Sequence, residues 1–87
     1  MAIELLYFAW VRETLGRGSE VVDVPAEAAT IADLLDWLAR NSADHARAFA
    51  DRDRLRAALD QEFSPLDAPL AGARELAIFP PVTGGSL

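Results

Sequence analysis

The chain has 87 residues and contains no cysteine, no lysine and only one histidine. Without cysteine it can form neither a disulfide framework nor a thiolate metal site. A role in sulfur handling would therefore need sulfur to ride on a group other than a side-chain thiol. Without lysine, an activated acyl group on this chain would meet no lysine amine of its own, and lysine-linked chains on this protein are impossible.

Long apolar runs and a positive net charge are also missing. No stretch of the sequence is long and apolar enough to suggest a membrane span, and no basic-then-apolar segment suggests a secretory signal, so we expect a cytoplasmic protein. The formal net charge of −6 argues against nucleic-acid binding, which needs a basic surface. It is compatible with docking onto a basic patch of a partner and equally with plain solubility, and charge alone does not separate these two.

Few side chains in the sequence suggest catalysis or metal binding. His45 has no second histidine to join it in a metal site and lies in a polar stretch, which favours a surface position. Asp60 and Glu62 would share one face of a strand, so a pair of catalytic carboxylates is conceivable. No nucleophile or metal motif lies near them, which argues against that role.

The apolar residues that are present predict one small α+β domain. Thr30 and Asp33 form a capping-box pattern that begins a helix. Its apolar stripe has the spacing of one helix face and consists of Ile31, Leu34, Leu35 and Leu38. Strands are expected at residues 2–10, 19–24, 55–63 and 75–79, with a turn over 12–18 and a short helix or loop over 43–53. The order is β-β-α-β-β, with the helix packed across one face of the sheet.

The end of the sequence has the most specific pattern, because a strand runs into two prolines and then a Gly-Gly pair. Proline has no backbone N–H, so the prolines end sheet pairing and hold the chain extended. Glycine has no Cβ, so a Gly-Gly tip could enter a narrow channel. A flexible terminus without a function would also be rich in glycine and serine. From residue 80 to residue 85 the chain could reach roughly 20 Å. We expect a domain over 1–81 and a flexible tail over 82–87. The segment reads Phe79-Pro80-Pro81-Val82-Thr83-Gly84-Gly85.

This segment resembles the C-terminus of the MoaD/ThiS family of ubiquitin-like sulfur carriers, and most closely the small subunits of molybdopterin synthase. The resemblance extends over nearly the whole chain, through segments 6–13, 58–63 and 70–79. Asp60 stands where the family usually has Asn, and Ala71 and Ala73 stand where it usually has acidic residues. Ser86 and Leu87 follow Gly85, whereas the working form of the family ends at the second glycine.

The resemblance implies a β-grasp, ubiquitin-like fold with a mixed sheet and one main helix across it. It also implies a sulfur carrier for molybdenum cofactor biosynthesis. A MoeB-like enzyme would adenylate the Gly85 carboxylate with ATP, and a persulfide donor would convert it to a thiocarboxylate. The tail would then deliver sulfur to the pterin precursor inside a MoaE-like large subunit, in a heterotetramer whose catalytic side chains belong to that subunit. No cofactor would be bound stably. The partner-binding residues would be Phe79, Pro80, Pro81, Val82, Thr83 and Gly84.

Two other functions stay open at this point. One is a related carrier that serves thiamine, cysteine or another sulfur-containing metabolite. The other is a ubiquitin-like binding module with an unreactive tail. In the carrier hypotheses Ser86 and Leu87 must be removed before activation, whether they are a cloning remnant, a natural extension or a pro-segment.

Overall fold

The computed structural model describes residues 1–81, so the predicted tail over 82–87 lies outside the described residues. Along the chain, the first half has strand β1 (Ala2–Tyr7), helix α1 (Ala9–Leu15), strand β2 (Ser19–Asp23), helix α2 (Ile31–Asn41) and helix α3 (Ala43–Ala48). The second half has the 3-10 helix η1 (Arg52–Arg54) and strands β3 (Arg56–Leu59), β4 (Glu62–Ser64) and β5 (Glu75–Phe79). Among residues 1–81, no helix is long and apolar enough to cross a membrane.

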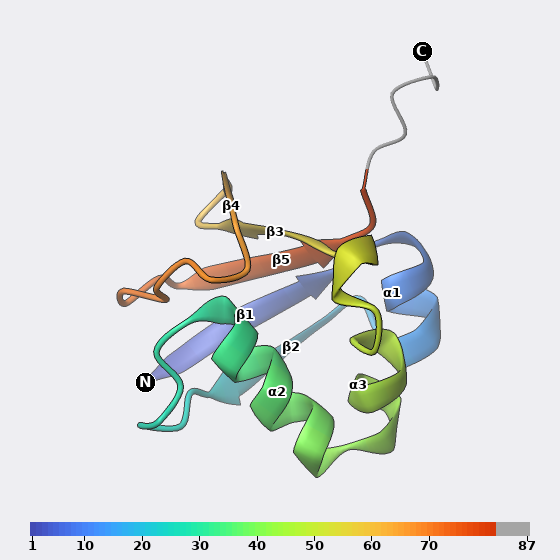
Figure 1. Ribbon diagram of the computed structural model, residues 1–87, viewed down its shortest axis with the longest axis horizontal. Coiled ribbons are helices and arrows are strands. Elements are labelled where there is room, and N and C mark those ends of the chain that lie inside the picture. The colour runs from blue at the N-terminus through green and yellow to red at the C-terminus, as the bar shows by residue number, and fades with distance from the viewer. Residues whose placement is uncertain (82–87) are drawn as a thin grey trace.

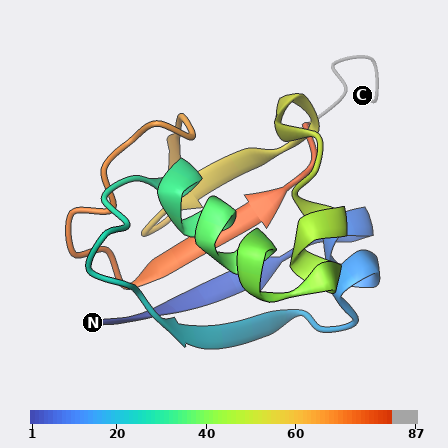
Figure 2. The same cartoon turned by 60° about the horizontal axis from the view of Figure 1, so that its bottom comes forward.

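The strands form one five-stranded mixed sheet in the order β2-β1-β5-β3-β4. The two central strands, β1 and β5, run parallel, and the other neighbouring pairs are antiparallel. Helix α2 crosses one face of this sheet, with α1 and α3 grouped at one end of it (Figure 2). The predicted α+β arrangement with one main helix across the sheet is confirmed.

Helix α2 begins where the capping pattern predicts. The backbone N–H of Asp33 donates to the Thr30 hydroxyl at 3.1 Å, and the backbone N–H of Thr30 donates to the Asp33 carboxylate at 3.1 Å. Bonds from the backbone N–H groups of Ala29 and Thr30 hold the pKa of Asp33 below its ordinary value. The four residues of the predicted stripe are all buried against the sheet: Ile31, Leu34, Leu35 and Leu38.

Alternation along the central strands gives the sheet two different faces. Side chains on the helix side are fully buried and form the core with α2, among them Leu5, Leu76 and Ile78. The residues between them point to the opposite face, because successive side chains of a strand alternate. No helix covers that second face in Figure 1, and we call it the open face.

The first predicted strand is too long. It ends at Tyr7, and the last residues of the predicted strand belong to α1, which also extends into the predicted turn over 12–18. The helix ends at Leu15 and is capped by Gly16, whose φ of 75° is left-handed and whose N–H donates to the Arg12 carbonyl at 2.9 Å. The prediction was wrong because an apolar run does not distinguish a buried strand from a short buried helix.

The single strand predicted over 55–63 is also wrong. The segment is a hairpin of β3 and β4, with Asp60 at φ 48° and Gln61 at φ 73° in the turn. Asp60 Oδ1 accepts hydrogen bonds from the backbone N–H groups of Arg74 and Glu75, each at 3.0 Å. Its carboxylate therefore joins the hairpin to the start of β5, and it does not form a catalytic pair with Glu62.

Candidate functional site

The predicted tail leaves the domain from the middle of the sheet. Phe79 is the last residue of β5, which lies between β1 and β3, and its side chain is half-buried. Pro80 and Pro81 follow outside any helix or strand and are also half-buried. Their missing N–H groups explain why sheet pairing ends at Phe79. In Figure 1 this end of β5 lies beside α1 and η1.

The other residues predicted for the site are Val82, Thr83, Gly84 and Gly85, and they lie outside the described residues. Phe79, Pro80 and Pro81 are consecutive and mark where the chain leaves the sheet. Their part in partner binding, like the role of Gly85, stays a prediction.

An apolar groove on the open face lies directly beside Phe79. The ring of Phe63 on β4 is 5.8 Å from the ring of Phe79, centroid to centroid, and is 85% exposed. We call this feature the aromatic groove, and its lining residues are Arg56, Ala57, Phe63, Ser64, Pro65 and Phe79. Large exposed aromatic side chains around a hollow are typical of protein interaction sites. The groove therefore gives this end of the sheet a surface on which a partner could dock.

The aromatic groove continues into an apolar stripe across the open face. The pairing register places Ala58 opposite Phe63 and opposite Ala77, and Ala77 opposite Leu6. On the far edge strand, Val21 is 68% exposed on the same face. Small and apolar side chains thus extend from one edge of the sheet to the other, which makes a flat surface for contact.

Sequence reasoning missed Phe63 as a site residue. It was placed at the end of one continuous strand over 55–63, where an aromatic side chain fits a buried core equally well. The available signal was its position between the polar residues Glu62 and Ser64, which suits an exposed edge strand. Its neighbour in space, Phe79, is sixteen positions away in the sequence, so the pairing needed the β3–β5 register.

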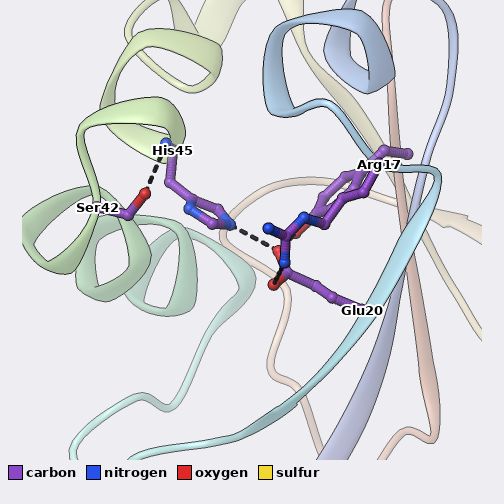
Figure 3. Close-up of polar contacts among 5 residues, drawn as sticks. Arg17, Glu20, Ser42 and His45 are labelled. Carbon is purple, nitrogen blue, oxygen red and sulfur yellow. Dashed lines mark hydrogen bonds and ion pairs between the residues drawn. The ribbon is translucent and has the colours of Figure 1, made fainter.

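A polar cluster lies on the opposite side of the sheet, beneath α3 (Figure 3). We call it the Glu20 cluster, and it consists of Tyr7, Arg17, Glu20 and His45. The predicted surface position of His45 was wrong, since only 9% of this residue is exposed. Its Nε2 lies 2.6 Å from Glu20 Oε2, which also accepts a 2.6 Å bond from the Tyr7 hydroxyl. Arg17 donates to the other carboxylate oxygen at 3.2 Å. An ionised carboxylate only accepts, so Nε2 carries the proton of this bond.

These contacts shift two pKa values in opposite directions. Burial, reinforced by the bond to Glu20, raises the pKa of Tyr7. Burial also raises the pKa of Glu20, but hydrogen bonds from Tyr7 and His45 outweigh that effect and leave its pKa below the ordinary value. The Glu20 carboxylate already accepts from three side chains, so we assign it a structural role in which it fastens α3 to β1 and β2. No group of acidic or histidine side chains suited to holding a metal ion occurs within residues 1–81.

Comparison with known proteins agrees with this architecture. The model of the ThiS family matches residues 5–85. The molybdopterin synthase sulfur carrier subunit of Escherichia coli strain K12 is 40% identical over 83 residues, which cover 95% of this chain and 99% of that protein. The subunit of the same name from Haemophilus influenzae is 31% identical with the same coverage. The crystal structure of SAMP1 from Haloferax volcanii superposes with a TM-score of 0.73 at 33% identity, covering 98% of this chain and 100% of that one.

The match to the family begins in β1 and runs to the second glycine of the tail. The structural likeness extends over the same sheet and helices, so the predicted β-grasp fold is confirmed. The resemblance noted in the sequence is confirmed as well, both over the whole domain and in the tail that follows it. The chain therefore belongs to the ThiS family of ubiquitin-like sulfur carriers.

Proposed function

We propose that this chain is the sulfur carrier subunit of a molybdopterin synthase and that the Gly85 carboxylate is the group that carries sulfur. The observation that supports this most is the match of residues 5–85, which ends at Gly85, together with full-length relatives named for that role. The absence of cysteine agrees with it, because sulfur would travel on the main-chain carboxyl group. No cofactor is held by the carrier in this scheme.

The oxygen of a carboxylate is a poor leaving group, so the Gly85 carboxylate must first be activated. A MoeB-like enzyme transfers AMP from ATP to the Gly85 carboxylate and releases pyrophosphate. The terminal sulfur of a donor persulfide then attacks the acyl carbon, and AMP leaves. A thiol cleaves the resulting S–S bond and is itself oxidised to a disulfide with the donor's remaining sulfur, which leaves a thiocarboxylate on Gly85. We expect this chemistry in the cytoplasm, where ATP is supplied.

In the second half of the scheme, the tail enters a MoaE-like large subunit. The thiocarboxylate sulfur forms a C–S bond to a carbon of the pterin precursor as the C–O bond at that carbon breaks and its oxygen leaves in protonated form. Water then cleaves the thioester, which restores the Gly85 carboxylate and leaves the sulfur on the precursor as a thiolate. A second carrier repeats the transfer and completes the dithiolene. The catalytic side chains belong to the large subunit. The carrier contributes a docking surface, the aromatic groove and its continuation on the open face, from which Pro80 and Pro81 lead the tail away.

The test is reconstitution with the large subunit, the adenylating enzyme, ATP, a persulfide donor and the pterin precursor. A form of the chain ending at Gly85 should support formation of the dithiolene product. Gly84→Val should retain a wild-type circular dichroism spectrum and lose product formation, because a branched side chain restricts φ and widens the slim tip. Product formation at the wild-type rate by Gly84→Val would contradict the channel-insertion step. If instead the form ending at Gly85 makes no product but becomes attached to other proteins, the chain is a protein modifier.

A further inference from the structure

The charged side chains of the open face are separated by sign along the strands. At the end where the tail leaves, Arg56 lies opposite Phe79 in the β3–β5 register and shares its face. At the other end, Glu4 lies opposite Glu75 in the β1–β5 register, also on the open face. The apolar stripe lies between these two ends. The face therefore has a cationic end at the base of the tail and an anionic end away from it.

Arg56 is held in a fixed position at its end. Its Nη1 donates to the backbone carbonyl of Asp53 at 3.1 Å and to that of Leu55 at 2.8 Å. The residue is exposed, lines the aromatic groove and forms no ion pair with any carboxylate of residues 1–81. The remaining N–H groups of a guanidinium have the geometry to bind a carboxylate, and arginine is enriched in protein interfaces.

The opposite end carries two carboxylates in adjacent positions. Glu4 and Glu75 are cross-strand neighbours, and like charges directly opposite each other destabilise a sheet. Neither forms an ion pair within the described part of the chain. A cationic side chain from a partner would remove this repulsion. A partner that covers the open face would therefore need a negative charge at the Arg56 end and a positive charge at the end with Glu4 and Glu75.

We propose that this separation of charge sets the direction in which the large subunit docks, an inference that rests on the proposed function. The large subunit presents a carboxylate to Arg56 and a cationic side chain to Glu4 and Glu75, with apolar residues between them. A partner turned end for end would bring its carboxylate against the two glutamates, and such like-charge contacts exclude wrong orientations. The direction matters because the tail starts at the Arg56 end and must point into the partner's active site.

The experiment measures the dissociation constant of the full chain with the purified large subunit at low and at high salt. Arg56→Glu should weaken binding by at least about tenfold at low salt, equivalent to about 1.4 kcal/mol. Arg40→Glu is the matched control, because Arg40 is exposed on α2 and the variant makes the same change in net charge. It should change affinity by less than about twofold. The difference between the two variants should shrink at high salt.

A second pair of variants examines the anionic end. Glu75→Arg should weaken binding, whereas Glu27→Arg in the exposed loop before α2 should not. Arg56→Gln, which removes the positive charge without introducing a negative one, should give an intermediate affinity and serves if Arg56→Glu fails to fold.

Equal weakening by Arg56→Glu and Arg40→Glu would overturn the inference, because only net charge would then matter. A Phe79→Ala variant separates this failure from failure of the docking surface. If Phe79→Ala weakens binding and Arg56→Glu does not, the aromatic groove docks without the charge and only the directional inference is wrong. If neither weakens binding, the open face is not the docking surface, and the inference is overturned with it. The role of Gly85 is tested separately by reconstitution.

Discussion

At the scale of single residues, polar side chains fix the start of α2 and the position of α3. Thr30 and Asp33 are three positions apart, so their reciprocal capping bonds could be predicted directly. His45 and Glu20 are twenty-five positions apart and meet only because α3 packs over β2, so nothing local indicated that His45 is buried. Gly84 and Gly85 stood out because a Gly-Gly pair after two prolines is a local pattern, whereas Phe63 became a candidate site residue only through the folded sheet.

The Glu20 cluster predicts a specific loss of stability in acid. The folded chain holds the pKa of Glu20 below its ordinary value of 4.5, so the folded state binds this proton less readily than the unfolded chain. The resulting stabilisation is complete above pH 4.5 and is lost as the pH falls through the folded-state pKa. Glu20→Gln should therefore lose less stability than the wild type on acidification from neutral pH. Chemical denaturation at a series of pH values measures this.

The control for that series is Glu27→Gln, which removes an exposed carboxylate in the loop before α2. It should retain the acid-dependent loss seen in the wild type. Should Glu20→Gln and the wild type lose the same free energy of unfolding between neutral pH and pH values below 4.5, the cluster would not be an acid-sensitive contact.

At the scale of elements, hydrophobic periodicity correctly predicted α2 but not the boundaries of β1, α1, β3 and β4. The stripe from Ile31 to Leu38 has a full two turns of helical spacing, which a strand cannot reproduce. The apolar run on either side of Tyr7 is too short to show a helical or a strand period, so the sequence did not reveal where β1 ends and α1 begins. The β3–β4 hairpin was missed because its turn uses Asp60 and Gln61 where a glycine would be the usual signal.

Truncation of a side chain in the apolar stripe of α2 should destabilise the whole domain. Leu35 is fully buried, so Leu35→Ala should lower the free energy of unfolding by about 2–5 kcal/mol. In so small a domain this would unfold a substantial fraction of the protein. Arg40→Ala, exposed on the same helix, should change stability by less than about 0.5 kcal/mol. Denaturant titration of both variants decides the point, and equal effects would show that this helix face is not core.

The hairpin turn should become more stable with glycine. Gln61 has φ 73°, a left-handed conformation that costs a residue with a side chain about 1–2 kcal/mol. Gln61→Gly should therefore raise the melting temperature. Glu62→Gly, one position further and inside β4, should lower it, because glycine weakens a strand. A lower melting temperature for Gln61→Gly would mean that the side chain of Gln61 stabilises the turn more than its backbone strains it.

On the scale of the whole molecule, the features assigned to function gather at one end of the sheet. The aromatic groove, Arg56 and the start of the tail all lie where β5 ends, while the Glu20 cluster ties α3 to the opposite face. In the proposed function, the fold is the base from which Gly85 would be presented to other proteins once Ser86 and Leu87 are removed. The sequence alone predicted the tail and its chemistry. The proposed docking surface could not be predicted without the strand register, which brings residues from β3, β4 and β5 together.

Intact-mass spectrometry of the C-terminus tests the central claim most directly. The chain is incubated with the purified adenylating enzyme, ATP and a persulfide or sulfide source, in the absence of protease. A form ending at Gly85 should gain the mass of one oxygen-to-sulfur exchange, located at Gly85 by fragmentation, and the form that retains Ser86 and Leu87 should stay unchanged. Equal reaction of the longer form at Leu87, or no exchange in the form ending at Gly85, would contradict the account of this chain as a glycine-tipped sulfur carrier.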